Sequence, residues 1–587
     1  MLKIKNIKHI KKLEADYKNH DLSDVVILSL PIHKQDVINP FTEKEKNIAS
    51  SETLAKLVAC SNNLLADNGY LFIYGTPAQL VEAYKNIPKT SKFRYWISVD
   101  AIDEIEKNTS DNLKHSHLGI LMISKGDKYA SLDTKNTRLP YIACSSCGRN
   151  VKDWGGKKHL MNTKGAGVSD VWRDFYKIKE KKKDPDNSSI SLNIIDPLKS
   201  SINIKKAGLP ENVKTRLLAL VESQKKNVLI INVDESLLLP ISNTQSISNK
   251  KQVFKVFSLK EIQNKVILGD CIEEMEKLSK QYPEGVFDLV FADPPYNLQK
   301  NYKVYDDGLA DQEYINWCNR WLELCVRLTK PTGSIFILNI PKWALEHAKH
   351  LNKIAYLQNW IVWDALSTPK GKIMPAHYSL LYYSKSPSGF TFNRPDMIDH
   401  SSYCVRNTCV ESRHHGLFET SYKVEVSDFW SDLHRIKHKK NRDDHPCQLP
   451  DKLMDRIIKT FSKEEDLVFD PFAGAGTTAI RAIKNNRRYT TIEIDPSYKE
   501  ITEKKLLDIL KNGEVQRHSV VKKTKTLYTK KYLETKAQEL SISLGKKPSL
   551  EEFLSTYSLD IIGISQLYKE PEQVLKAGRI GLLNGSV

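Results

Sequence analysis

The chain has 587 residues, too many for a single hydrophobic core, so about two to four domains are expected. Its 89 lysines and arginines against 71 acidic residues give a formal net charge of +18, which favours a polyanionic partner such as nucleic acid, although a lysine-rich proteome would give the same excess. The sequence contains no apolar run of about 18 residues, so no membrane span is predicted. The basic N-terminus lacks the apolar core of a signal peptide. Nine cysteines without framework spacing favour reduced thiols in a cytoplasm.

The first half of the chain predicts alternating strands and helices. Asp24–Pro31 predicts a strand that ends at a proline, Ser51–Ala66 an amphipathic helix, and Gly69–Gly75 a second strand. A helix followed by a strand is predicted again much later, at Trp321–Leu328 and Gly333–Asn339. The chain therefore has an α/β rhythm in both halves.

Several short segments of the first half recur in the same order in the second half. Tyr95–Asp100 (YWISVD) resembles Asn359–Asp364 (NWIVWD), and Val168–Trp172 (VSDVW) resembles Val426–Trp430 (VSDFW). The shift is 264 positions for the first pair (360 − 96) and 258 for the second (430 − 172). A nearly constant shift is typical of internal duplication. Two unrelated α/β domains with the same rhythm are the alternative.

Two further features of the first half stand apart from this rhythm. Tyr176–Ser200 is charged and then polar, which predicts a mobile connection. Cys144 and Cys147 have the spacing that begins many zinc sites, and Cys404 and Cys409 fall at the matching place in the second half. The spacing is not that of a complete four-ligand site, so no metal is assigned and reduced structural thiols are expected.

The stretch with the most specific chemistry is Asp293-Pro294-Pro295-Tyr296. The mostly apolar run Val286–Phe291 leads into it, which predicts a buried strand that ends in a turn. The prolines fix φ and remove two backbone donors, so the turn presents carbonyl groups and one carboxylate in a rigid frame. Asp293 and a backbone carbonyl would accept the two N–H bonds of a planar amine while Tyr296 stacks on its ring. Such acceptors stabilise positive charge on the nitrogen.

A second motif, between Leu467 and Thr478, predicts a strand, a glycine-rich turn and a helix to about Asn485. Its glycines let the backbone approach a ligand, and the N-terminus of the helix favours negative charge. Glu493 follows in the next predicted strand, where a carboxylate accepts both hydroxyls of a ribose. The missing third glycine favours S-adenosylmethionine over a dinucleotide. The candidate ligand-binding residues of the motif are Asp470, Phe472, Gly474, Gly476, Thr477 and Thr478.

Together the two motifs resemble those of DNA amino-methyltransferases, which methylate adenine N6 or cytosine N4. The acceptor loop precedes the cofactor loop by 178 positions (474 − 296), which is the order of the β class. The resemblance implies a Rossmann-like α/β fold and methyl transfer from S-adenosylmethionine to a base flipped out of double-stranded DNA. It implies catalysis by Asp293, Pro294, Pro295 and Tyr296. Adenine N6 is favoured because family members with aspartate at the start of the loop mostly act on adenine.

The resemblance implies roles for residues outside the two loops. Asp270 corresponds to an acid near the adenine of the cofactor, and the segment from His445 to Pro450, including Gln448, resembles an HPTQKP element beside its methionine. Here cysteine and leucine replace the threonine and lysine of that element, and Thr491 replaces a glycine two residues before Glu493. Residues 365–445 correspond to the target-recognition region. Their candidate DNA contacts are Lys370, Lys372, Arg435, Lys437, Lys439, Lys440 and Arg442, with a solvated basic loop as the alternative.

Three domains follow from these patterns. Residues 1–250 are predicted to be a degenerate methyltransferase-like copy, since Ser-Leu-Pro-Ile replaces the acceptor loop and no glycine occurs from Asn232 to Leu239. Residues 251–512 are the predicted catalytic domain. Residues 513–587 predict a linker and helices in which Ser549 caps a helix, resembling the DNA-binding helical repeat of some homing endonucleases. A docking helical tail is the alternative for this last part.

The expected partners follow from the resemblance. Family members often act as homodimers, so a fused degenerate copy predicts a monomer that works as an internal pseudo-dimer on double-stranded DNA. A cognate restriction endonuclease is a further expected partner. Cytosine N4 methylation, an RNA methyltransferase and a non-catalytic DNA-binding specificity subunit remain alternatives, although the intact Asp293, Gly474 and Glu493 argue against the last.

Overall fold

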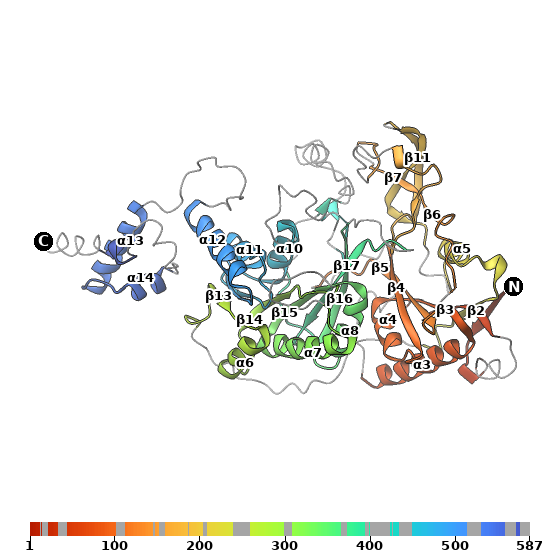
Figure 1. Ribbon diagram of the computed structural model, residues 1–587, viewed down its shortest axis with the longest axis horizontal. Helices are drawn as coiled ribbons and strands as arrows, with labels where there is room; N and C mark the ends of the chain where they lie inside the picture. Colours follow the sequence, from red (N-terminus) through yellow and green to blue (C-terminus); the bar gives the residue numbers. More distant parts are fainter. Residues whose placement is uncertain are drawn as a thin grey trace.

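The computed structural model shows two units built on β-sheets and one small helical unit (Figure 1). The first unit lies within residues 1–238, the second within 259–512, and the helical unit within 530–575. The structure describes residues 1–11, 13, 22–32, 44–100, 112–128, 130–144, 147–151, 159–185, 187–202, 208–238, 259–298, 308–365, 373–393, 398–399, 423–424, 427–431, 433, 449–512, 530–557 and 571–575.

The first unit contains a sheet of seven described strands in the order β1-β12-β2-β3-β5-β4-β9. Successive residues of β2, such as Val26 and Ile27, pack into different cores because side chains alternate between the faces of a strand. Helices α3 (Lys44–Asn63) and α4 (Pro77–Lys85) cover one face, and α5 (Glu211–Leu220) covers the other. The strands are β1 (Leu2–Ile7), β2 (Ser23–Ser29), β3 (Leu65–Gly75), β4 (Ser91–Asp100), β5 (His117–Lys125), β9 (Val171–Trp172) and β12 (Val228–Val233).

The second unit contains a sheet of eight described strands in the order β13-β22-β21-β14-β15-β17-β16-β20. They are β13 (Lys265–Leu268), β14 (Phe287–Ala292), β15 (Thr329–Asn339), β16 (Tyr356–Asp364), β17 (His377–Ser384), β20 (Phe429–Trp430), β21 (Leu467–Asp470) and β22 (Arg488–Glu493). The packed helices are α6 (Cys271–Gln281), α7 (Asp311–Leu328) and α8 (Pro341–Leu351) on one face, and α10 (Asp451–Phe461), α11 (Thr477–Lys484) and α12 (Pro496–Asn512) on the other. This confirms the predicted Rossmann-like α/β architecture.

The two sheets share much of their strand order. The sequence β12-β2-β3-β5-β4-β9 of the first sheet corresponds to β21-β14-β15-β17-β16-β20 of the second. In both, one strand runs antiparallel between two parallel ones, β5 in the first sheet and β17 in the second. They differ at one end: β22 lies beside β21, whereas β1 occupies that place beside β12. No described strand of the first unit follows β12 in the chain as β22 follows β21.

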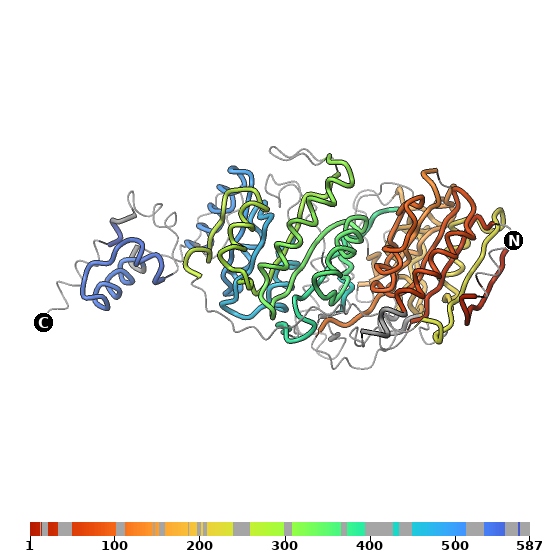
Figure 2. The backbone as a smooth tube through the Cα atoms, turned by 90° about the horizontal axis from the view of Figure 1, so that it is seen from below, coloured from red at the N-terminus to blue at the C-terminus, as the bar shows by residue number. Residues whose placement is uncertain are grey.

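Helices α6, α7, α8, α4 and α3 form one layer below both sheets (Figures 1 and 2). One hydrophobic core runs through this layer and includes Leu57 and Val81 of the first unit with Trp321 and Leu345 of the second. Tyr84 at the end of α4 donates a hydrogen bond of 2.6 Å to Glu346 of α8. The two units therefore share a continuous apolar core.

The contacts between the two units occur in equivalent pairs. His117 Nδ1 lies 3.0 Å from Asp428 Oδ1, and His377 Nδ1 lies 3.2 Å from Asp170 Oδ1. The aspartates are 258 positions apart (428 − 170) and the histidines 260 (377 − 117), so each pair is the counterpart of the other with the units exchanged. Burial alone would raise the pKa of Asp428, but the neighbouring His117 and His115 hold it below its ordinary value.

An aromatic pair also joins the two units through equivalent residues. Trp96 of β4 and Trp360 of β16 are stacked at 4.1 Å with 6° between their ring planes. Each is the second residue of its repeated segment, YWISVD or NWIVWD, so each contacts its own counterpart. A contact between equivalent residues is the mark of a two-fold, isologous interface.

The segment Tyr176–Ser200, predicted to be a mobile connection, is instead a β-ribbon. Strand β10 (Tyr176–Asp184) pairs antiparallel with β11 (Asn187–Ser200), which also pairs with β7 (Tyr141–Ala143). Ile190 and Leu192 are fully buried in a small core with Met161. The prediction was wrong because the lysines of β10 dominate the composition and hide the alternation of β11. Two short strand pairs, β6 (Arg138–Leu139) with β8 (Ala166–Gly167) and β18 (Ile398–Asp399) with β19 (Lys423–Val424), complete the described sheets.

The helical unit contains α13 (Lys530–Leu544), α14 (Leu550–Thr556) and the 3-10 turn η5 (Pro571–Leu575). Its core includes Leu533, Ala537 and Phe553. The predicted cap is confirmed, since Ser549 and Glu552 exchange side-chain and backbone hydrogen bonds at the start of α14. No described helix of the chain combines the length and apolar character that crossing a membrane requires.

Candidate active site at the carboxyl edge of the second sheet

The two predicted loops meet at one edge of the second sheet. Strands β14 and β21 are parallel neighbours, and β22 runs parallel beside β21. Asp293 therefore follows the carboxyl end of one strand, while Asp470 and Glu493 end the next two. Ligands of open α/β sheets bind at this edge, outside the carboxyl ends of the strands.

The acceptor loop from Asp293 to Tyr296 is compact and partly buried. The Tyr296 hydroxyl donates a hydrogen bond of 2.6 Å to Asp293 Oδ1. The Tyr296 ring is 8% exposed and lies 5.8 Å from the ring of Tyr378 in β17. A carboxylate and an aromatic ring therefore stand side by side at the mouth of the loop, as its sequence predicts.

Two buried side chains hold this loop from below. The Tyr314 hydroxyl in α7 donates to the carbonyl of Pro295 over 2.5 Å, and Trp343 Nε1 in α8 donates to the carbonyl of Tyr296 over 2.7 Å. Both rings are almost fully buried and contact each other at 4.6 Å. The carbonyl groups of the last two loop residues thus point into the protein.

A hydrogen-bonded chain fixes the direction of the Tyr314 hydroxyl. Asn339 Oδ1 accepts the backbone N–H of Ile340, so Asn339 Nδ2 faces the Tyr314 oxygen at 3.3 Å and His347 Nε2 at 3.0 Å. Because Nδ2 can only donate, His347 Nε2 must accept and its ring must be neutral. Burial supports this, since it lowers the pKa of His347 to about 3.

The sequence analysis did not predict that Tyr314 and Trp343 hold the acceptor loop. One sequence feature could have indicated it: the matching positions of Gln79 and Trp343 in their helices. In the first unit Gln79 Nε2 donates to the carbonyl of Pro31 over 2.8 Å, in the loop after β2. Gln79 and Trp343 are each the third residue of a helix that begins with proline, and they are 264 positions apart (343 − 79), the same shift as the stacked tryptophans. The two units therefore hold equivalent loops in the same way.

The glycine-rich loop has the backbone its sequence predicts. Gly474 and Gly476 have φ of 49° and 79°, in the left-handed region that favours glycine. A Cβ at Gly476 would lie 2.4 Å from Thr502 Cγ2 in α12. The carbonyls of Gly474 and Ala475 accept hydrogen bonds from Thr502 and Lys505, so α12 anchors the outer side of the loop.

Glu493 faces the inner side of the same loop. Its Oε2 accepts the backbone N–H of Gly474 over 2.7 Å, and its Oε1 accepts that of Asp495 over 2.9 Å. Burial raises the pKa of Glu493 to about 7, although these two N–H groups oppose the shift. Each oxygen keeps one lone pair for a further donor, which fits the two hydroxyls of a ribose.

Asp470 holds the glycine-rich loop in shape by accepting hydrogen bonds from two residues of the motif. Its Oδ1 accepts the backbone N–H of Phe472 over 2.8 Å and its Oδ2 accepts the Thr478 hydroxyl over 2.5 Å. Burial raises the pKa of Asp470 to about 6, against the effect of these two donors. Thr477 opens helix α11 directly after the loop, at the end that favours negative charge.

Asp270 lies at the same edge, but its carboxylate is engaged. It caps helix α6 by accepting the backbone N–H groups of Ile272 and Glu273 over 2.9 and 3.1 Å. The neighbouring Gly269 N–H donates to the carbonyl of Glu493, so the turn lies against the end of β22. Asp270 is thus close to the predicted cofactor site and also holds a helix start.

Several predicted site residues lie outside the described part of the chain. They are His445, Gln448, Lys370, Lys372, Arg435, Lys437, Lys439, Lys440 and Arg442, together with Cys404 and Cys409. Cys144 is buried and Cys147 exposed. Among the described residues no group of three or more histidine, cysteine or acidic side chains is placed to hold a metal ion.

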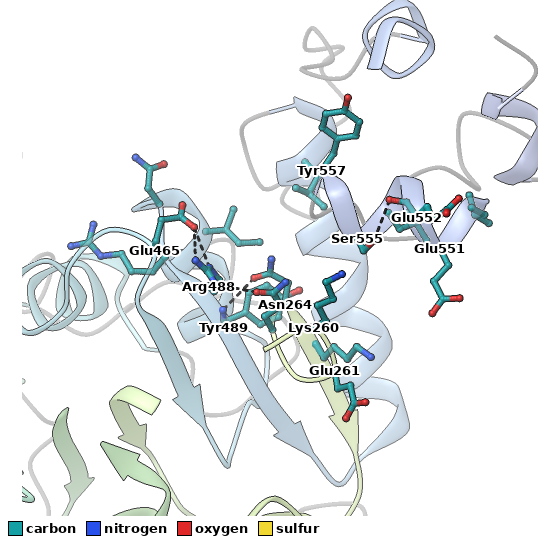
Figure 3. Close-up of a pocket in the computed structure, with 18 of the residues that line it drawn as sticks. Lys260, Glu261, Asn264, Glu465, Arg488, Tyr489, Glu551, Glu552, Ser555 and Tyr557 are labelled. Carbon is teal, nitrogen blue, oxygen red and sulfur yellow. Dashed lines mark hydrogen bonds and ion pairs between the residues drawn. The ribbon is translucent and has the colours of Figure 1, made fainter. Parts of the chain in front are cut away.

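A groove of about 1320 Å³ lies elsewhere, between the second unit and α14 (Figure 3). It is lined by charges of both signs, including the ion pair between Arg488 and Glu465 at 3.0 Å and the side chain of Glu551. Arg488 begins β22, so the groove is at the amino edge of the sheet, opposite Glu493. It is separate from the meeting point of the two loops.

Comparison with known proteins identifies the second unit. The family model described as DNA methylase, for N6 and N4 enzymes, matches residues 287–504. The type II methyltransferase M.BamHI of Bacillus amyloliquefaciens is 36% identical over 240 residues, which cover 39% of this chain and 54% of that protein. M.HpaI of Haemophilus parainfluenzae, also a type II methyltransferase, is 31% identical over 239 residues, covering 39% of this chain and 71% of M.HpaI. The chain belongs to the DNA methylase family.

The methyl donor of this family is S-adenosylmethionine, as the resemblance implied. The DNA adenine methyltransferase YhdJ of Escherichia coli K12 is 28% identical over 267 residues, which cover 44% of this chain and 88% of YhdJ. The chain spans about half the length of M.BamHI, and the family model lies wholly within the second unit. The first unit and the helical unit are outside that match.

Proposed function

We propose that the second unit transfers a methyl group from S-adenosylmethionine to the exocyclic amine of a base in double-stranded DNA, at adenine N6. The observation that carries this is the meeting of two loops on the neighbouring strands β14 and β21. One presents Asp293 beside Tyr296, and the other presents Gly474 with the buried Glu493. An amine acceptor and a ribose-binding carboxylate thus lie at one sheet edge.

The acceptor loop binds the amine and stabilises the positive charge that develops on its nitrogen. The carbonyls of Pro295 and Tyr296 point into the protein, towards their donors in α7 and α8, so the carbonyl that joins Asp293 in holding the amine is that of Pro294. The Tyr296 ring supplies the stacking surface for the flipped base. As the nitrogen gains positive charge, the Asp293 carboxylate stabilises it in a partly buried site.

The cofactor loop supplies orientation. S-adenosylmethionine, when bound, supplies a methyl group on a positively charged sulfur. Glu493 accepts the ribose hydroxyls, the glycines allow close approach, and Asp470 keeps the loop in shape through Phe472 and Thr478. Asp270 and Thr477 border the same site, and His445 and Gln448 are assigned to it from the sequence. Alignment of donor and amine accounts for much of the rate in such transfers.

Adenine N6 is supported by the aspartate at the start of the acceptor loop and by the similarity to YhdJ. Cytosine N4 presents the same kind of amine and is the competing assignment. Nucleoside mass spectrometry of DNA from cells that express the protein tests both. N6-methyladenine is expected, N4-methylcytosine would correct the base, and the absence of both would contradict the function.

We infer that the first unit is a degenerate copy that acts as a built-in second subunit. The shared strand order, the paired contacts of Asp428 and Asp170, and the self-stacking of Trp96 on Trp360 support a duplicated, two-fold arrangement. The described first unit has no counterpart of β22, the strand that carries Glu493. The lack of such a strand among the described residues supports a copy that keeps its packing surface but binds no cofactor.

The intact chain should then be monomeric in light scattering. The isolated fragment 251–512 exposes the apolar surface around Trp360 and should bind cofactor but methylate DNA poorly. A fragment as active and selective as the whole chain would contradict this role. A cognate restriction endonuclease remains a proposed partner, drawn from the type II methyltransferases among the relatives.

A further inference from the structure

The β10–β11 ribbon rises above the sheet of the first unit (Figure 1). Leu192 of β11 is fully buried in the small core beside β7, so its side of the ribbon is the inner face. Lys182 of β10 pairs with Leu192 and lies on that same face. Lys181 and Lys183 pair with Asn193 and Ser191 and therefore point to the opposite, outer face. The ribbon is a packed element with one face left to solvent.

The outward charge of β10 is strongly positive. Lysine occupies positions 177, 179, 181, 182 and 183, and Glu180 is the one acid between them. Lys177, Lys181 and Lys183 are all exposed, and none of the described acidic groups lies within ion-pair distance of these three. Like charges held this close repel one another unless a polyanion lies nearby.

The base of the ribbon stands at the edge that carries the chemistry. The chain enters β10 from the carboxyl end of β9, and there Arg173 forms an ion pair of 2.7 Å with Asp364. Asp364 ends β16, which runs in the same direction as β14 because both β15 and β16 are antiparallel to β17. The ribbon therefore starts from the sheet edge on which the Asp293 loop lies.

We propose that the outer face of the β10–β11 ribbon, with Lys181 and Lys183, together with the exposed Lys177 at the base of the ribbon, is an arm that binds the phosphate backbone of the DNA duplex beside the target base. This rests on the proposed function of the second unit. The arm belongs to the first unit, whose described residues include no counterpart of β22, and it gives that unit a role in DNA binding. Contacts of this kind add affinity and register without reading sequence.

A triple substitution, Lys177→Gln with Lys181→Gln and Lys183→Gln, tests the arm. The control replaces Lys89, Lys92 and Lys128, three exposed lysines of the same unit near the amino end of β4, at the opposite edge. Both variants lose the same charge. Affinity for a duplex is measured by fluorescence anisotropy at several salt concentrations, with cofactor affinity and thermal unfolding as checks on folding.

The ribbon variant should bind DNA more weakly. The plot of log affinity against log salt should become shallower, with the magnitude of its slope reduced by about three, roughly one per lost phosphate contact. Cofactor affinity should stay at the wild-type value, and the control should keep most of the slope. If the wild type binds the duplex and the ribbon variant matches it, the arm is wrong and the proposed function stands. Equal losses in both variants would also overturn the arm. A wild type that binds no duplex would overturn the proposed function and the arm together.

Discussion

Removing one hydroxyl below the acceptor loop should slow methyl transfer without weakening cofactor binding. Tyr314→Phe deletes the group that donates to the carbonyl of Pro295 and accepts from Asn339. A buried carbonyl and a buried amide N–H then each lose this partner. The ring and its contact with Trp343 remain, so the apolar packing changes little.

The magnitude follows from the cost of an unsatisfied buried group, about 1–3 kcal/mol. The loop can relieve that cost by moving the Pro295 carbonyl, and any such movement displaces Asp293, two residues earlier. Since about 1.4 kcal/mol corresponds to a factor of ten, the single-turnover rate should fall by about five-fold to about 150-fold. Glu493 ends β22 and Gly474 lies in the loop after β21, away from the Pro295 carbonyl, so the dissociation constant for S-adenosylmethionine should not change.

Tyr383→Phe is the matched control. Its hydroxyl is also buried and donates to Asn352 Oδ1 over 2.6 Å, at the far end of α8 from Trp343. It should lose similar stability in thermal unfolding while keeping the wild-type transfer rate. A Tyr314→Phe variant that is less stable but transfers methyl groups at the wild-type rate would refute the positioning role, as would equal slowing of both variants.

Three further outcomes are expected. Because burial raises the pKa of Glu493 to about 7, its carboxylate is protonated below that pH, so cofactor affinity in calorimetry should rise about ten-fold from pH 6 to pH 8, and Glu493→Gln should abolish the rise. The same titration should give one cofactor per chain, and two would contradict a degenerate first unit. Asp428→Ala leaves His117 without its buried hydrogen-bond partner and should lower the free energy of unfolding by about 1–3 kcal/mol in denaturant titrations; an unchanged value would show that the interface does not depend on this pair.

The parts of the site that depend on local sequence were predictable. Asp293 and Tyr296 follow a buried strand, and Gly474 and Glu493 lie at the turn and strand end that their motif requires. The glycines were identified because they let the backbone approach a ligand, and in the structure left-handed φ and close approach to α12 also exclude other residues. Residues whose role depends only on their own short motif could therefore be predicted from the sequence of that motif.

What the sequence did not reveal depends on distant segments meeting. Tyr314 and Trp343 look like ordinary apolar helix positions, and only the fold places their polar atoms at the loop carbonyls. The β10–β11 ribbon was missed because its order comes from packing against Met161 and β7, not from its own composition. The self-stacking of Trp96 and Trp360 was likewise implied by no single segment, although the repeat in the sequence suggested two similar units.

The most direct test of the central claim is methyl transfer by Asp293→Ala, measured with labelled S-adenosylmethionine and duplex DNA beside calorimetry of the cofactor. The wild type should transfer the label to an exocyclic amine. The variant should bind the cofactor as tightly as the wild type, because its Glu493 and glycine loop are intact, and should transfer no label. Wild-type turnover by Asp293→Ala would contradict the assignment of this loop as the site of the reaction.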